Sequence, residues 1–105
     1  MAYAEVLSAL ADRTRRNIFE ALGSHAMTVG ELARLQPVSR PAVSQHLRVL
    51  EAANLVSVRP EGTRRLYAAK GDGLEELRRY LDRFWTDPLS AYSAESDRRR
   101  KGRKK

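Results

Sequence analysis

The sequence predicts a mainly α-helical domain with one small β-hairpin, an α+β fold of about five helices and two strands. Three observations predict it. Apolar residues recur at helical spacing near the start of the chain and again over 74–85, two short helical segments follow one another across a turn at 36–38, and an alternating pattern flanks a Pro/Gly turn at 60–63. The length of 105 residues suits one domain. We expect that domain to occupy residues 1–93.

The first predicted helix has an apolar stripe whose members fall at i, i+3, i+4 and i+7. They are Tyr3, Val6, Leu7 and Leu10. A second helix is expected to begin after Asp12, its N-cap, and to end at Gly23. Basic residues in its first turn oppose the helix dipole, so they either form a solvated or salt-bridged turn, with Asp12 or Glu20 as partner, or have a structural role that supports DNA contacts. These residues are Arg13, Arg15 and Arg16.

Two further short helices, 28–35 and 39–53, are predicted around a tight turn. Thr28 and Glu31 form a capping box at the start of the first, whose inward side chains are expected to be Val29, Leu32 and Leu35. Pro37 disfavours helical geometry at the residue before it, and Ser39 can cap the next helix. Two short helices joined by such a turn are the outline of a helix-turn-helix.

The second of these helices has two chemically distinct faces. Val43, Leu47 and Leu50 define the buried face, and the opposite face has an amide and a guanidinium, Gln45 and Arg48. In a DNA major groove these groups pair bidentately with adenine and guanine. An ordinary solvated face is the alternative, but the neighbouring turn and an Arg-rich hairpin favour base reading. The residues predicted to bind DNA are Ser39, Arg40, Pro41, Ser44, Gln45 and Arg48. His46, on the shoulder of the buried face, is expected to be packed and hydrogen-bonded.

The alternation over 55–59 and 64–68 predicts a β-hairpin. Its basic and hydroxyl side chains suit contact with a phosphate backbone. They are Arg59, Thr63, Arg64 and Arg65. The segment Asp72-Gly73-Leu74-Glu75 then predicts the capped start of a final long helix with apolar residues on one side, and Asp87-Pro88 predicts a last short helix through Tyr92.

Composition and charge exclude several function classes. The absence of cysteine excludes disulfides, thiolate metal sites and a thiol nucleophile. The net charge of +7 comes from residues 98–105, which hold seven of the 20 basic residues, so 13 basic and 13 acidic residues remain before them. We expect residues 94–105 to be a disordered basic tail. No apolar run is long enough to cross a membrane and no secretory signal is visible, so we expect an intracellular protein.

Several stretches together resemble the ArsR-type winged helix-turn-helix repressors. They are ALADRTRRNIFEAL at 9–22, TVGELARL at 28–35, SRPAVSQHLRVLEAANLV at 39–56 and RPEGTRRLY at 59–67. The resemblance implies a homodimer, with an interface formed by the first and last helices, that binds an imperfect palindrome in double-stranded DNA. The implied interface residues are Tyr3, Val6, Leu7, Leu10, Leu77, Leu81, Phe84 and Trp85.

The chain departs from the family's metal sensors. It has Thr28, Val29 and Gly30 where some members have paired cysteines, and its histidines are His25 and His46 alone. We therefore expect no metal site, no cofactor and no metal response, and we expect a cytoplasmic, nucleoid-associated autorepressor. An architectural protein that binds nucleic acid through the basic tail, without regard to sequence, is the alternative. An enzyme is not expected, because no nucleophile–base pair is visible. A small-molecule effector, a protein antagonist or no inducer would all fit the sequence.

Overall fold

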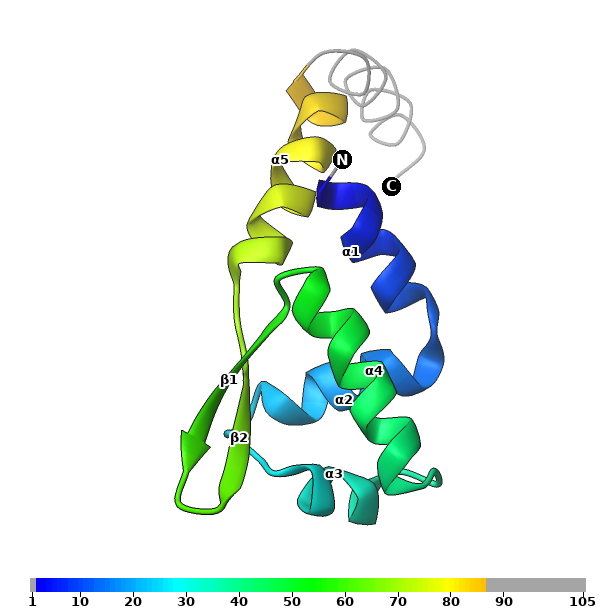
Figure 1. Ribbon diagram of the computed structural model, residues 1–105. Coiled ribbons are helices and arrows are strands. Elements are labelled where there is room, and N and C mark those ends of the chain that lie inside the picture. The colour runs from blue at the N-terminus through cyan, green and yellow to red at the C-terminus, as the bar shows by residue number, and fades with distance from the viewer. Residues whose placement is uncertain (1, 87–105) are drawn as a thin grey trace, which may run out of the picture.

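The computed structural model describes residues 2–86 and confirms the predicted fold class, five helices and an antiparallel two-stranded hairpin (Figure 1). The elements are α1 (Ala2–Ala11), α2 (Arg13–Leu22), α3 (Val29–Leu35), α4 (Arg40–Ala52), β1 (Val56–Glu61), β2 (Arg64–Ala69) and α5 (Asp72–Thr86). The predicted short helix from Asp87, the domain boundary at 93 and the basic tail lie outside the described residues.

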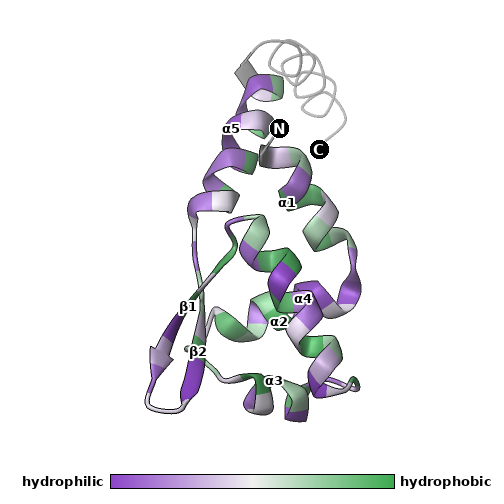
Figure 2. Cartoon of the chain, viewed as in Figure 1, coloured by the Kyte–Doolittle hydropathy of each residue, from purple (hydrophilic) through white to green (hydrophobic). Residues whose placement is uncertain are grey.

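Helices α1 to α4 pack around a shared core, and the hairpin lies beside α2, α3 and α4 (Figure 1). Helix α5 returns from the hairpin and packs along α1, so the first and last described helices lie side by side. Toward its tip the hairpin is predominantly hydrophilic (Figure 2). The arrangement places α3, the start of α4 and the tip of the hairpin at one end of the molecule and the α1–α5 pair at the other (Figure 1).

Three of the predicted N-caps, those of α2, α3 and α4, are confirmed. The side chains of Asp12, Thr28 and Ser39 each accept the backbone N–H three residues on, at 3.0, 3.2 and 3.3 Å. The capping box at Thr28 is complete, because Oε1 of Glu31 accepts the Thr28 N–H at 2.9 Å. Each cap satisfies a donor that the first helical turn leaves without a partner, which fixes where α2, α3 and α4 begin.

The core within residues 2–86 is wholly apolar and combines side chains from α1, α2, α3, α4 and β1. Its largest fully buried side chains are Val6, Ile18, Leu32, Val43, Leu47, Leu50, Leu55 and Val56. Leu35 departs from its predicted inward position, since it is 58% exposed. It is the last residue of a seven-residue helix, which turns away from the core before its final side chain can be buried.

The hairpin loop is shorter than predicted. Pro60 and Glu61 belong to β1 and pair with Arg65 and Arg64, which leaves a two-residue loop. Gly62 occupies the first loop position with φ of +64°, the conformation for which a type II′ turn uses glycine. Pro60 is tolerated in β1 because this strand is an edge of a two-stranded sheet.

A backbone bridge that sequence analysis missed attaches β2 to the segment between α2 and α3. Met27 and Tyr67 exchange two backbone hydrogen bonds, of 2.9 and 2.8 Å, in an isolated antiparallel bridge. Both side chains are buried. The base of the hairpin is therefore held rigidly, and only its distal half projects away from the helices.

The start of α5 differs from the prediction, because Asp72 is its first helical residue rather than its cap. The N–H of Gly73 donates to the carbonyl of Asn54 at 2.9 Å, and Asn54 ends α4 in the left-handed region with φ of 60°. A β-carbon at position 73 would collide with the carbonyl oxygen of Ala53. This close approach of two chain segments fixes where α5 leaves the hairpin.

Candidate nucleic-acid interface

Helix α4 presents the predicted polar face to solvent. Its inner residues Val43, Leu47 and Leu50 are at most 1% exposed, whereas Gln45 and Arg48 are exposed on the other side. Pro41 is also exposed, and Ser44 is half-buried. The helix is thus anchored by one face while the opposite face is free to meet a ligand, which is the arrangement that major-groove recognition requires.

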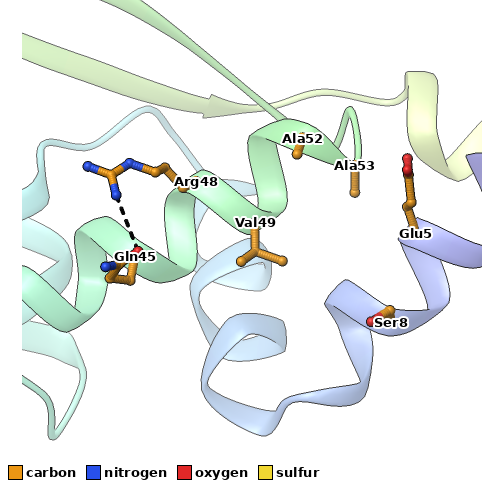
Figure 3. Close-up of a pocket in the computed structure, with 7 residues that line it drawn as sticks. All are labelled: Glu5, Ser8, Gln45, Arg48, Val49, Ala52 and Ala53. Atoms are coloured by element: carbon orange, nitrogen blue, oxygen red, sulfur yellow. Dashed lines mark hydrogen bonds between the residues drawn. The ribbon is translucent and has the colours of Figure 1, made fainter.

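The two side chains on this face are joined to each other. Nη1 of Arg48 donates to Oε1 of Gln45 at 3.3 Å (Figure 3). The bond uses one of the two lone pairs of the amide oxygen and one donor of the guanidinium. Bidentate pairing with adenine uses both polar atoms of the glutamine, so Oε1 of Gln45 would accept from the base with its second lone pair or release Arg48.

A groove of about 450 Å³ runs between this helix and α1 (Figure 3). Gln45, Arg48, Val49, Ala52 and Ala53 line it from the α4 side, and Glu5 and Ser8 line it from α1. Along α4, the lining of the groove changes from the polar Gln45 and Arg48 to the apolar Val49, Ala52 and Ala53.

The other two residues of this segment that were predicted to bind DNA, Ser39 and Arg40, lie at the start of α4. Oγ of Ser39 accepts the N–H of Ala42, so its hydroxyl caps the helix. Arg40 is exposed, and its guanidinium lies over Gly30 of α3: a β-carbon on Gly30 would be 3.0 Å from Nη2 and 3.2 Å from Cζ.

The distal half of the hairpin is here called the wing. The four wing residues that were predicted to contact a phosphate backbone are all exposed. They are Arg59, Thr63, Arg64 and Arg65. Arg64 makes a 3.9 Å ion pair with Glu61 directly across the hairpin, with both side chains more than half exposed. A surface pair of this kind contributes little to stability and leaves the guanidinium able to change partner.

The arginines at the start of α2 have a structural role. Arg15 donates through Nε to the carbonyl of Ala9 at 2.8 Å and through Nη2 to that of Ser8 at 3.4 Å. Arg16 donates through Nη1 to the carbonyls of Leu10 and Ala11, at 2.7 and 3.2 Å. These carbonyls lie in the last turn of α1, where positive charge stabilises the helix dipole. Arg15 and Arg16 thus bind the end of α1, and a role of these arginines in supporting DNA contacts stays a prediction.

His46 is packed and hydrogen-bonded, as predicted. Its Nδ1 lies 3.4 Å from Nη1 of Arg15, and its side chain is half-buried. Asp12, beside this pair, has a lowered pKa, chiefly because its carboxylate accepts the Arg15 backbone N–H and also because of the nearby charges of Arg15 and His46. The histidine therefore connects α4 to the α1–α2 corner.

The α1–α5 pair exposes most of the apolar residues predicted for a dimer interface. Leu7, Leu81, Phe84 and Trp85 are 37–59% exposed, while Tyr3, Leu10 and Leu77 are half-buried. The prediction was wrong for Val6, which is 1% exposed and therefore belongs to the core of the subunit instead of an interface. The stripe on α1 is split, because α1 packs on α2 and α4 as well as on α5.

Tyr80 was missed by sequence analysis. Its ring stacks on that of Tyr3 with centroids 4.0 Å apart, and Phe84 meets it edge-on at 5.1 Å. The spacing of Tyr80, three residues after Leu77 and four before Phe84, was a visible signal that it shares their face.

No group of three or more His, Asp or Glu residues that could hold a metal ion occurs among residues 2–86. In the same part, no helix has both the length and the apolar character needed to cross a membrane.

Comparisons with known proteins agree with this geometry. A family model described as a helix-turn-helix domain matches residues 10–59. The HTH-type transcriptional regulator Rv2034 of Mycobacterium tuberculosis is 60% identical over 85 residues, which are 81% of this chain and 79% of that protein.

Solved structures show the same likeness. An ArsR-like transcriptional regulator from Rhodococcus sp. RHA1 has a TM-score of 0.78 and 33% identity over 91% of each chain. The homodimeric winged helix-turn-helix DNA-binding domain of Mb0332 from Mycobacterium bovis has a TM-score of 0.63 and 26% identity over 90% of this chain and 79% of that one. This chain belongs to the ArsR family of winged helix-turn-helix, DNA-binding transcriptional regulators, which are not enzymes.

Proposed function

We propose that this protein is a homodimeric repressor that binds a pseudo-palindromic operator, in which α4 reads bases and the wing contacts phosphates. The observation that carries the proposal is the exposed Gln45–Arg48 pair on a helix whose other face is fully buried. An amide and a guanidinium side by side are suited to adjacent A·T and G·C pairs in a major groove.

The residues proposed to bind DNA surround this pair. On α4 and its cap they are Ser39, Arg40, Pro41, Ser44, Gln45 and Arg48, and on the wing they are Arg59, Thr63, Arg64 and Arg65. All except Ser44 are exposed, and they lie on α4, its N-cap and the wing. The arginines of the wing supply charge that fixes position on the duplex, while Gln45 and Arg48 supply sequence preference.

The dimer is proposed to form through α1 and α5. Their exposed apolar side chains, with the aromatic cluster of Tyr3, Tyr80 and Phe84, form a surface that a second copy can cover. The solved relative from Mycobacterium bovis is a homodimer, which supports dimerisation of this chain. Two α4 helices related by a two-fold axis would enter successive major grooves about 34 Å apart. A dimer seated across two turns obstructs other proteins on that DNA, which favours repression.

We also propose that the repressor does not respond to metal ions. Its sequence lacks cysteine, and His46 already contacts Arg15. Carboxylates alone form a weak, unselective site for transition metals. Incubation with Zn(II), Cd(II), Cu(I) or As(III) should leave the melting temperature of the pure protein unchanged, and a reproducible rise with any of them would contradict the proposal. Acting on DNA, the protein would be found in the cytoplasm with the nucleoid.

The test is binding to the DNA upstream of the protein's own gene, compared with scrambled DNA of equal length. Specific recognition predicts affinity for the upstream DNA about a thousandfold tighter or more. Truncation after Asp97, which removes the seven basic residues of 98–105, should preserve this preference and reduce the salt dependence of binding. Equal affinity for both DNAs, or loss of nearly all binding on truncation, would favour the sequence-indifferent architectural protein.

A further inference from the structure

A basic cleft of about 390 Å³ lies where α3, the start of α4 and the wing meet. Four arginines line it: Arg34 from α3, Arg40 from α4, and Arg64 and Arg65 from β2. No carboxylate is among the residues that line it within the described part of the chain. Three segments that are separated in sequence thus direct positive charge into one opening, here called the arginine cleft.

The nearest carboxylates do not neutralise the arginine cleft. Glu31 is close enough for the charges of Arg64 and Arg34 to help lower its pKa, but the main cause of that lowering is its hydrogen bond from the Thr28 N–H. This carboxylate accepts a hydrogen bond in the capping box and offsets only part of the charge of the four arginines. Glu61 reaches Arg64 through a single exposed contact of 3.9 Å. The cleft retains a clear excess of positive charge.

Gly30 sets the place of one of the four guanidinium groups. Because position 30 has no side chain, the guanidinium of Arg40 can lie directly over its α-carbon, where a β-carbon would approach Nη2 to 3.0 Å. Any side chain at this position requires Arg40 to shift. Gly30 is thus a positioning residue for Arg40.

We infer that the arginine cleft is a phosphate site that holds the operator backbone through Arg34 and Arg40, with Gly30 keeping Arg40 in place. The planar guanidinium group can donate two parallel hydrogen bonds to the oxygens of a phosphate. Several such groups in one opening favour an anion whose charge is distributed over several oxygens. The backbone of DNA is the source of that phosphate, because the cleft opens beside the base-reading helix and includes the wing. The inference rests on the proposed function and adds Arg34 and Gly30 to it.

The first test compares Arg34→Ala with Arg78→Ala in the full-length protein. Both remove one exposed guanidinium, but Arg78 lies on α5 and pairs with Glu75 at 3.4 Å. Arg34→Ala should weaken binding to operator and to scrambled DNA alike, about three- to tenfold, and should lower the salt slope by about one, as expected for one lost phosphate contact. Arg78→Ala should leave both nearly unchanged. Equal behaviour of the two variants, or an effect of Arg34→Ala on the operator alone, would overturn the inference.

The second test asks whether Gly30 acts through Arg40. Gly30→Ala should weaken DNA binding in the parent protein and have no further effect in an Arg40→Ala background. Its melting temperature should not fall, because alanine is the better helix former within α3. A loss of the same size in both backgrounds would contradict the positioning role. Gly71→Ala is the matched control, since a β-carbon there meets nothing within 4 Å.

The third test separates the two sources of phosphate. Inorganic phosphate and pyrophosphate are titrated at constant ionic strength into the protein, with and without Arg34→Ala. We expect no saturable binding at millimolar concentration. Saturable, Arg34-dependent binding of pyrophosphate combined with unchanged DNA affinity in Arg34→Ala would show a free anion to be the ligand. Failure of the parent protein to prefer its operator would contradict the proposed function but not this site, because Arg34→Ala is also measured on scrambled DNA.

Discussion

Nη1 of Arg15 lies 3.4 Å from Nδ1 of His46, which connects the α1–α2 corner to the helix proposed to read DNA. A guanidinium can only donate, so Nδ1 of the imidazole is the acceptor in this contact. The same guanidinium donates to the carbonyl of Ala9 near the end of α1. One side chain therefore joins three helices, and it relates the orientation of α4 to that of α1.

Replacement of Arg15 by alanine should lower the free energy of unfolding by about 1–3 kcal/mol. The variant loses hydrogen bonds from a charged donor to the last turn of α1, and bonds of this kind are worth about that much. Urea unfolding at fixed protein concentration measures the change. Arg13→Ala is the matched control, because Arg13 is exposed on the same turn. Similar losses in the two variants would show that charge, rather than the contacts of Arg15, is responsible.

Acid should destabilise the protein through two helix caps. The pKa of Asp12 is lowered chiefly by the hydrogen bond from the Arg15 N–H, and the pKa of Glu31 chiefly by the hydrogen bond from the Thr28 N–H. A carboxyl whose folded pKa lies below its unfolded value of about 4 contributes its full stabilisation above pH 4. That contribution is lost as the pH falls through the folded pKa.

The double variant Asp12→Asn/Glu31→Gln isolates this effect. The amides retain an oxygen that accepts the cap hydrogen bond, but they do not titrate in this range. Between pH 5 and pH 2.5 the urea midpoint of the variant should fall less than that of the parent protein. Parallel curves for the two proteins would show that acid acts at other carboxylates, such as Glu75 and Glu76 of α5.

Gly73 should tolerate no side chain. A methyl group there would collide with the carbonyl oxygen of Ala53 and press on Leu55, a fully buried core residue. Overpacking of this kind costs about 1–3 kcal/mol. Gly73→Ala should therefore lower the urea midpoint, while Gly71→Ala, which faces open space, should leave it nearly unchanged. A Gly73→Ala variant as stable as Gly71→Ala would mean that α5 moves away without cost.

Local rules predicted much of this structure because they depend on neighbours in sequence. Asp12, Thr28 and Ser39 cap helices through a residue three positions away, so their roles are visible in the sequence. The division of α4 into a buried and an exposed face follows from helical periodicity alone. The proposed base-reading residues Gln45 and Arg48 are exposed for the same reason.

The remaining features depend on contacts between distant segments. The bridge of Met27 to Tyr67 spans 40 residues and leaves no local pattern. Val6 follows the same periodicity as Leu7, yet packing of α1 against α2 and α4 buries the former and exposes the latter. The arginine cleft is likewise invisible in the sequence, because Arg34 comes near Arg64 only when the hairpin folds back beside α3.

The proposed dimer interface should fail when charge is placed on α5. Leu81 and Trp85 are 40% and 59% exposed in the subunit, so their replacement removes little from its own core. Leu81→Glu should convert the dimer to a monomer in sedimentation equilibrium, because burying an unpaired carboxylate against a second copy is costly. Arg78→Glu on the same helix is the control. A dimer that survives Leu81→Glu would place the interface on another surface.

Tyr80 should contribute to the α1–α5 pair within each subunit. Its stacking on Tyr3 and its edge contact with Phe84 are worth about 0.5–1.5 kcal/mol each beyond area burial. Tyr80→Ala should reduce stability, and Tyr80→Phe, which keeps the ring, should not. A Tyr80→Phe variant as unstable as Tyr80→Ala would assign the effect to the hydroxyl instead.

The Gln45–Arg48 pair should show coupled effects on operator binding. Gln45→Ala and Arg48→Ala should each cost about 1–3 kcal/mol on the operator and little on scrambled DNA. Each single variant also frees its partner from the 3.3 Å hydrogen bond that joins them, so the partner can meet the DNA without first breaking that bond. The double variant should therefore differ from the sum of the single losses by more than about 0.5 kcal/mol, the usual limit of additivity for independent sites. Additive losses would show that the pair does not act as a unit on DNA, and equal weakening on both DNAs would make the residue concerned a phosphate contact.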